Sequence, residues 1–269
     1  MRLREGRIPE ELYVKQADKL RGIQEAQKAF NKHLENSVKS GNLEKVKKII
    51  VTMVEETLLE PRTGSLESVS DTVDVLVDGY SNGIDVIKQL LNISSTDYSI
   101  VLHSINVMAY ALAFASFNNY SQYEAKTLGL CALLHDVGKK KINQDILNAP
   151  RKLTNAEFTE VKSHTTMGYN ILRECKFNEK EISICALEHH EKLDGSGYPN
   201  NKTAISRTAQ IVGLIDSFET LTNEERIYRK KMKPFDVLNQ IIKKDVKNGK
   251  FNAEIFSQFV KSLCAIKKI

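Results

Sequence analysis

The histidines of this chain are concentrated in one stretch of the sequence. Five of the six lie between positions 103 and 190, namely His103, His135, His164, His189 and His190. Two carboxylates, Asp136 and Asp216, stand in otherwise apolar stretches. Imidazole nitrogens and carboxylate oxygens are ligands for first-row divalent cations, and burying them without a compensating charge costs free energy. A lone helical histidine is more often an ordinary core or surface residue, but this concentration of ligands favours a metal site.

The number of candidate ligands indicates two metal ions rather than one. A single zinc site takes three or four protein ligands, and here seven are available. Two cations roughly 3.5–4 Å apart generate hydroxide from water at neutral pH and clamp a phosphoryl group for in-line attack. Lys139, just beyond the His135–Asp136 pair, is placed to neutralise a phosphate oxygen as charge develops. The alternative for Lys139 is a solvated turn, since it is one of 39 basic residues.

The elements that position these residues are predicted to be helices. Apolar residues recur at helical spacing, and Thr154 with Glu157 has the form of a capping box. A polar loop is expected at residues 139–153, after a left-handed Gly138 that ends the preceding helix. No strand pattern longer than a few residues follows residue 20, so the fold class is all-α. The expected helices cover about 42–59, 66–91, 97–117, 123–136, 155 onward, 179–190, 205–222 and 252–267.

The chain is expected to divide near residue 94. Residues 1–94 read as a mostly helical scaffold or regulatory region, with a helix over 17–38 and a short strand near 11–15. This region contains His33 but no chemical motif, and it is a candidate for homodimer contacts. Residues 95–269 contain all seven candidate metal ligands.

Composition is that of an ordinary globular protein. Apolar residues make up 41% and charged residues 27%, and no run approaches the roughly 18 uninterrupted apolar residues of a membrane span. The four cysteines are widely spaced and read as reduced core thiols, which favours a cytoplasmic location. A net charge of +5 suits an anionic small ligand better than DNA. The Lys-rich segment 226–250 reads as a solvated face.

Two segments resemble motifs of a known family. Residues 135–139 read HDVGK and resemble the motif of the HD phosphohydrolase superfamily. Residues 189–199 read HHEKLDGSGYP and resemble the HHExxDGxGYP signature of its HD-GYP branch, with every defined position filled. His103 and the pair His164 and Gly168 match the motifs before and between these two. The likeness covers about residues 95–265.

This resemblance implies a helical bundle of the HD-domain type with an additional N-terminal helical region. The implied activity is hydrolysis of cyclic di-GMP to pGpG, and in some members to GMP, by a hydroxide that bridges two metal ions. Some relatives cleave a cyclic GMP-AMP dinucleotide instead. The implied cofactors are two divalent ions, iron in the first place and manganese as the alternative.

The motifs also carry residue roles onto this chain. One ion would be bound by His103, His135, Asp136 and Asp216, and the second by His164, His189 and His190, with Asp136 bridging both. Asp136 and Lys139 are the implied catalytic residues, Lys139 by contact with the scissile phosphate. The implied substrate-binding residues are Lys139, Gly195, Gly197, Tyr198, Arg226 and Arg229.

The sequence departs from the family pattern at three places, which bear on catalysis more than on metal binding. Ser99 stands where some relatives have a third-metal glutamate, which predicts two ions rather than three. Phe218 and Glu219 replace a tyrosine and an aspartate of the DxYDALT motif, and loss of the tyrosine hydroxyl would remove one hydrogen bond near the site. One extra residue precedes Arg226. The alternative function is therefore a weak or inactive module that binds a cyclic dinucleotide, or a partner such as a diguanylate cyclase through residues 194–199.

Overall fold

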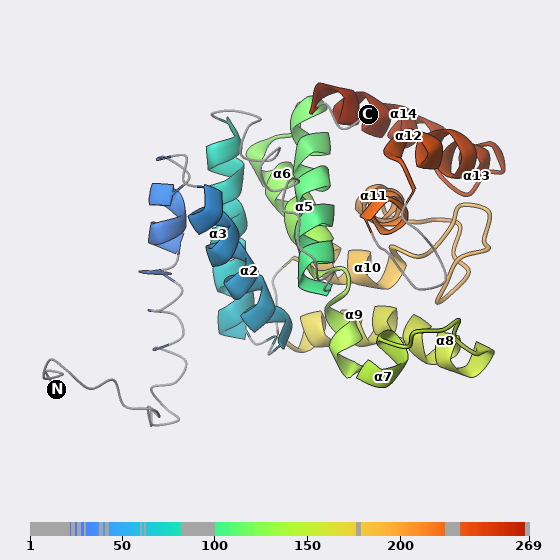
Figure 1. The fold of residues 1–269 in the computed structure, drawn as a ribbon, viewed down its shortest axis with the longest axis horizontal. Coiled ribbons are helices and arrows are strands. Elements are labelled where there is room, and N and C mark those ends of the chain that lie inside the picture. The colour runs from blue at the N-terminus through green and yellow to red at the C-terminus, as the bar shows by residue number, and fades with distance from the viewer. Residues whose placement is uncertain are drawn as a thin grey trace, which may run out of the picture.

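An apolar helix, α5 (Ile100–Phe117), runs through the centre of the protein. The helices α6 (Gln122–Leu134), α11 (Arg207–Asn223), α14 (Ala253–Ala265) and α2 (Leu43–Leu59) all pack against it. Figure 1 shows α2 and α3 (Thr63–Ser81) on one side of α5, and α11 and α14 on the other. Because α5 is surrounded, its apolar residues are not confined to one face.

The computed structural model describes residues 22, 25, 28–29, 31–37, 40, 43–59, 61, 63–81, 100–175, 179–223 and 232–266. Within these ranges the chain forms helices and turns without a β-strand, which confirms the all-α prediction. The remaining helices are α8 (Asn155–Lys162), α9 (His164–Glu174), α10 (Lys180–Glu188) and the short α7 (Gln144–Leu147). The predicted strand at 11–15 lies outside the described residues.

The helix α5 is also the one described segment that is long and apolar enough to cross a membrane by length and composition. The sequence was expected to contain no such segment. In the structure 67% of this helix is buried inside the protein, and it carries His103 among its buried residues. Packing within the core accounts for its composition.

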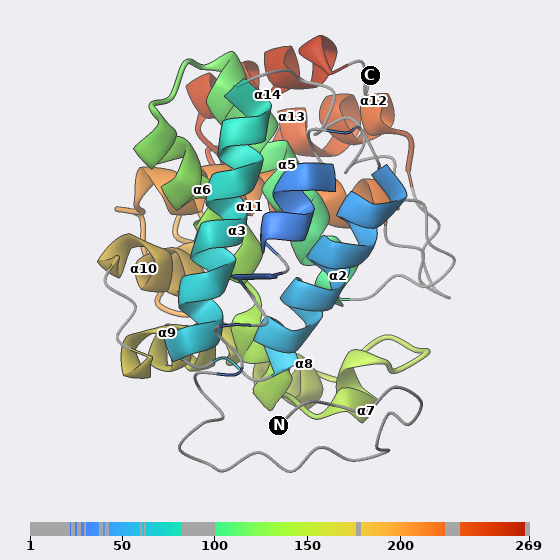
Figure 2. The same ribbon diagram turned by 90° about the vertical axis from the view of Figure 1, so that its left-hand side faces the viewer.

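The N-terminal helices share one hydrophobic core with the rest of the chain. Figure 2 shows α2 and α3 lying over α5 and α6. Ile50 and Val73 from these two helices are fully buried in the same cluster as Leu112 and Leu130. A methyl group on Gly129 of α6 would lie 3.0 Å from Val73 and Leu112 side-chain atoms, so the small residue lets three helices meet.

Helix starts agree with the capping signals, and one helix end does not agree with the prediction. Thr154 accepts from the Glu157 N–H and completes a capping box at the start of α8. However, α6 ends at Leu134, so His135 and Asp136 lie at the turn that leads into a 3-10 helix, η1 (Val137–Lys141). The segment expected to be a polar loop therefore contains η1 and α7.

The segment before the predicted last helix is helical as well. A turn α12 (Pro234–Asp236) leads into a π-helical segment η2 (Val237–Ile242) and then α13 (Lys243–Lys247). Lys233, Lys243 and Lys244 are exposed, as expected for a solvated face. The cysteines are free, but Cys264 is exposed, so the reading of all four as core thiols is wrong for that one.

Candidate metal centre

A first cluster of ligand atoms is formed by His103 of α5, His135 at the end of α6, and Asp216 of α11. The Nε2 of His103 lies 3.2 Å from the Nε2 of His135 and 3.1 Å from Oδ1 of Asp216. His135 Nε2 is 4.0 Å from the same oxygen. All three ligand atoms thus face one point between the three helices.

A second cluster joins three other histidines. His164 is the first residue of α9, and His189 and His190 follow α10. The Nε2 atoms of His164 and His189 lie 3.4 Å apart. Together with Asp136 these histidines present ligand atoms that all lie within 4.8 Å of one another. This is the grouping that the family motifs implied.

Asp136 lies between the two clusters. Its Oδ2 is 3.3 Å from His135 Nε2 and 3.5 Å from His103 Nε2, on the side of the first cluster. Its Oδ1 is 3.3 Å from His164 Nε2 and 3.8 Å from His189 Nε2, on the side of the second. The carboxylate is only 1% exposed, and no described residue donates a hydrogen bond to its Oδ1. A buried carboxylate oxygen without a donor is the feature that a cation would satisfy.

Backbone carbonyls fix the orientation of three rings. The Nδ1 atoms of His135, His164 and His189 lie 2.6, 2.6 and 3.0 Å from the carbonyl oxygens of Ala132, Val161 and Ala186. A carbonyl only accepts, so Nδ1 carries the proton in each ring and Nε2 keeps its lone pair. The hydrogen-bond pattern therefore assigns a tautomer that aims three lone pairs into the site, as outer hydrogen bonds do in metal centres.

A carboxylate orients the fourth ring. The Nδ1 of His103 lies 2.6 Å from Oε2 of Glu219, which is fully buried. Asn106, one turn after His103, donates to the other oxygen at 2.8 Å. Glu219 entered the sequence analysis only as a departure from the family motif. Its position three residues after Asp216, on the same helical face, is a signal that could have placed it near the candidate ligands.

The electrostatics of the site depend on burial and on neighbouring charge. Burial lowers the pKa of His164, His189 and His190, so these rings are neutral at pH 7 and able to coordinate. Burial would raise the pKa of Asp136, but Lys139 and His135 outweigh it and hold that pKa well below its usual range. Burial likewise lowers the pKa of His103, yet Glu219 and Asp216 raise it to about 10. The acids around the first cluster therefore favour a positive charge there, either a proton on His103 or a bound cation.

The two clusters fit a pair of divalent cations. The ligand atoms are nitrogens and carboxylate oxygens without a thiolate, a set suited to borderline first-row metals. The Nε2 lone pairs of the histidines converge on the site, and no described residue donates a hydrogen bond to Oδ1 of Asp136, which supports the same conclusion. Within the part of the chain that the structure describes, the seven predicted ligands are brought together and none lies elsewhere.

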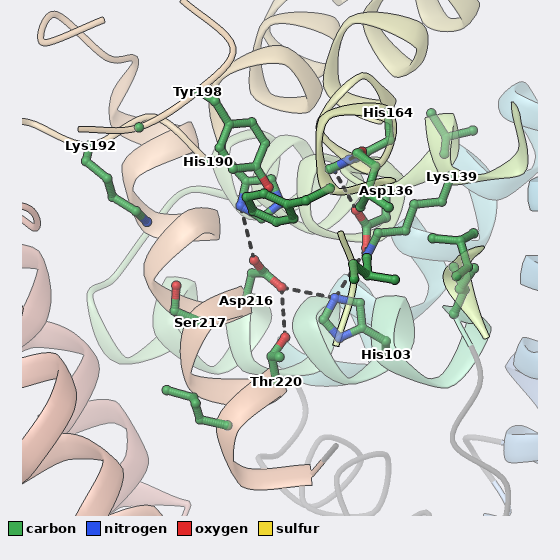
Figure 3. A pocket seen from close by; sticks show the side chains of 18 of the residues that line it. His103, Asp136, Lys139, His164, His190, Lys192, Tyr198, Asp216, Ser217 and Thr220 are labelled. Carbon is green, nitrogen blue, oxygen red and sulfur yellow. Dashed lines mark hydrogen bonds and ion pairs between the residues drawn. The ribbon is translucent and has the colours of Figure 1, made fainter. Parts of the chain in front are cut away.

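A cavity of about 1420 Å³ opens above the clusters. His103, Asp136, His164, His190 and Asp216 line it, as Figure 3 shows, while His135 and His189 are fully buried behind them. Ligand sites in proteins are commonly about 300–1,000 Å³, so this cavity has room for a dinucleotide.

Lys139 lies on the cavity wall, and its Nζ is 2.5 Å from Oδ2 of Asp136. A close backbone contact holds its segment against α9. A methyl group added at Gly138 would lie 1.9 Å from the carbonyl oxygen of His164 and 2.5 Å from the Gly168 nitrogen. Gly138 does not have a positive φ, so the expected left-handed helix end is wrong. The glycine is needed because the η1 and α9 backbones touch.

Residues 194–199, the glycine-rich segment, lie at the mouth of the cavity, and some of them line it. Tyr198 and Gly197 line it, and the Tyr198 ring lies against His190 with centroids 4.6 Å apart. Gly195 has a φ of 77° and serves the turn, and it does not line the cavity. Glu191 holds the segment by accepting from the backbone N–H groups of Asn200 at 2.7 Å and Lys202 at 2.9 Å.

The structure corrects the reasoning on Phe218. The sequence analysis placed its missing hydroxyl near the site, but the side chain is fully buried in the core. Its ring packs edge-on against Tyr110 and Phe259, at 5.5 and 5.2 Å between centroids. Arg226 and Arg229, the predicted basic pair, and Ser99 lie outside the described residues.

The sequence analysis did not single out several residues of the cavity, among them Lys192 and Phe158. Lys192 was passed over because it fills an undefined position of the HHExxDGxGYP signature, yet it lines the cavity. Phe158 of α8 also lines the cavity, is 47% exposed, and lies 6.4 Å from the Tyr198 ring. No motif pointed to Phe158, because its place depends on how α8 packs.

The chain is similar to known proteins over most of its helical part. The HD domain family matches residues 85–255. The cyclic di-GMP phosphodiesterase PA4108 of Pseudomonas aeruginosa is 30% identical over 72% of this chain and 46% of its own length. The 3'3'-cGAMP-specific phosphodiesterase 1 of Vibrio cholerae is 34% identical over 51% of this chain and 32% of its own length. A cyclic di-GMP phosphodiesterase of Thermotoga maritima is 31% identical over 56% and 43%.

Among solved structures, the chain resembles Bd1817 of Bdellovibrio bacteriovorus, described as an HDG"Y"P protein. The TM-score is 0.73 over 94% of this chain and 82% of that one, at 16% sequence identity. At that identity the likeness concerns the fold. The chain spans less than half the length of each of these curated relatives.

Proposed function

The chain belongs to the HD domain family, and on this premise we propose that it is a metal-dependent phosphodiesterase that hydrolyses cyclic di-GMP. One observation carries the proposal: the two oxygens of buried Asp136 face two different histidine clusters at the floor of a large cavity. Relatives that carry the names of cyclic di-GMP and cGAMP phosphodiesterases support the substrate class.

We assign one ion to His103, His135 and Asp216 and a second to His164, His189 and His190, with Asp136 shared by both. The proposed metal is iron, with manganese as the alternative. When bound, such ions supply an activated water and stabilise negative charge on a phosphoryl group.

The protein's own residues have three tasks in this proposal. Backbone carbonyls and Glu219 hold the histidine rings with their lone pairs directed into the site. Lys139 contacts a phosphate oxygen from its place beside Asp136 and neutralises charge that develops there. Tyr198 and Gly197 contact the nucleotide at the mouth of the cavity. Arg226 and Arg229 remain predicted substrate contacts.

The proposed products are pGpG and GMP. A second candidate substrate is 3'3'-cGAMP, because relatives 34% identical to this chain carry that specificity in their names. Both substrates are cyclic dinucleotides with two phosphodiester bonds, so the proposed chemistry is the same.

The test is a product assay on protein prepared without oxygen. The purified chain is loaded with Fe²⁺ or Mn²⁺ under reducing conditions and supplied separately with cyclic di-GMP and 3'3'-cGAMP, and products are separated by chromatography. We expect linear dinucleotide, followed by mononucleotide. Tight binding of either ligand with no product over hours would instead support the alternative of a binding module that docks a signalling partner, and would contradict the enzyme.

A further inference from the structure

Lys192 lies on the cavity wall formed by the C-terminal helices. Its neighbours on this wall include Asp245 and Phe251, and its Nζ lies 4.1 Å from the centre of the Phe251 ring. In Figure 3 Lys192 is on one side of His190 and Asp216, and Lys139 is on the opposite side. Among the lysines that line the cavity, Lys139 and Lys192 therefore lie on opposite sides of the proposed metal ligands.

These two lysines differ in what neutralises them. Lys139 pairs with Asp136. Lys192 makes no ion pair with any carboxylate among the described residues, and the Phe251 face is its one contact of this kind. Nearby Lys250 pairs with Asp245 at 3.3 Å, so that acid is already engaged. An ammonium that is withdrawn from solvent gains from an anionic partner, and a ring face compensates only in part.

A cyclic dinucleotide has two phosphodiester groups, and only one of them is cleaved at a time. When one lies over Asp136 and Lys139, the ring of the ligand carries the other one away from the clusters. From the place of Lys192, we propose that its ammonium binds this second, non-reacting phosphate of the dinucleotide. The inference rests on the proposed function and assigns a binding role to a position that the family signature leaves undefined.

The test compares two lysine-to-methionine variants that each remove one positive charge from the same wall. Binding of a non-hydrolysable phosphorothioate analogue of cyclic di-GMP to the metal-loaded full chain is measured by equilibrium dialysis. Lys192→Met is expected to weaken binding by about 10- to 100-fold, the usual value of a charge-assisted hydrogen bond. Lys250→Met, whose charge is already paired, is expected to stay within about threefold.

If Lys192 only supported the fold, Lys192→Met would lower the metal content or the thermal stability along with the affinity. Both are therefore measured for each variant and are expected to stay at the wild-type level. Lys192→Arg, which keeps the charge, is expected to recover most of the affinity. If Lys192→Met does not fold, Lys192→Gln takes its place with the same expected loss.

Salt gives an independent readout. The affinity of Lys192→Met is expected to fall less steeply with ionic strength than that of the wild type, because one charge contact is missing. Wild-type affinity in Lys192→Met overturns the phosphate subsite and leaves the proposed function standing. A wild-type chain that binds no cyclic dinucleotide at all overturns both.

Discussion

The metal clusters and the wall around Lys192 differ in how their side chains are held. In the clusters, His135, His164 and His189 are each fixed by a backbone carbonyl, and His103 is fixed by Glu219. On the opposite wall, the ammonium of Lys192 lies over the Phe251 ring and makes no ion pair with a described carboxylate. The histidine rings are thus fixed before any ligand binds, whereas the Lys192 ammonium has no fixed anionic partner. This difference is the one expected between a metal centre and a substrate-binding wall.

The largest expected effect comes from removing the residue shared by both clusters. Asp136→Ala is expected to lower kcat/KM for cyclic di-GMP by about a thousandfold or more, because neither cluster keeps its carboxylate link. The measurement is the initial rate of product formation at several substrate concentrations. Asp145→Ala, at an exposed acid of α7, is the matched control. Comparable activity of the two variants would contradict the role of Asp136.

Because the backbones of η1 and α9 touch at Gly138, a larger residue at this position is expected to lower the stability of the protein strongly. Gly138→Ala places a methyl group 1.9 Å from the His164 carbonyl oxygen, so the two segments must separate. We expect the free energy of unfolding to fall by about 3 kcal/mol, measured by urea denaturation. Gly22→Ala, where a methyl group meets nothing within 4 Å, is the control. An unchanged midpoint for Gly138→Ala would show that the contact is not tight.

Loss of the carboxylate that holds His103 predicts weaker binding of one ion only. Glu219→Gln keeps the shape of the side chain but removes its charge, so the ring is less firmly held and less basic. Metal affinity at the first cluster is expected to fall by about 10- to 100-fold, measured by competition with a chelator. Glu254→Gln, at an exposed position of α14, is the control. Equal loss of both ions would indicate general unfolding instead.

The smallest effect is expected for Phe218→Tyr. From the sequence, the hydroxyl that Phe218 lacks was expected to lie near the site. The structure places the ring between Tyr110 and Phe259, so the added hydroxyl is buried in the core. We expect a loss of about 1–3 kcal/mol of stability and no gain in rate, measured by thermal unfolding and product assay. A clear increase in rate would return Phe218 to the site.

The residues of the two clusters were predictable because each occupies a local motif. His135 with Asp136, and His189 with His190, are neighbours in the sequence, and the helices that carry His103 and Asp216 show clear apolar patterns. Phe218 and Lys192 were not predictable in this way. Which face of α11 meets α14, and what lies opposite an undefined position in a signature, are decided by packing between elements distant in the chain.

At Gly138 the residue type was noticed in the sequence, but the reason for it was not. The sequence shows a glycine after a helix, and the usual reason is a left-handed residue. In the structure the reason is the approach of α9, whose first residue follows 26 positions later in the chain. The residue type was informative, but its physical cause required the tertiary contact.

The most direct test of the central claim is metal content per chain, measured by plasma emission on protein prepared without oxygen. We expect two ions in the wild type and in His33→Ala, which removes the exposed histidine outside the clusters. We expect about one ion in His164→Ala, which damages only the second cluster, and almost none in Asp136→Ala. Two ions retained by Asp136→Ala would contradict the claim that this carboxylate joins two metal sites.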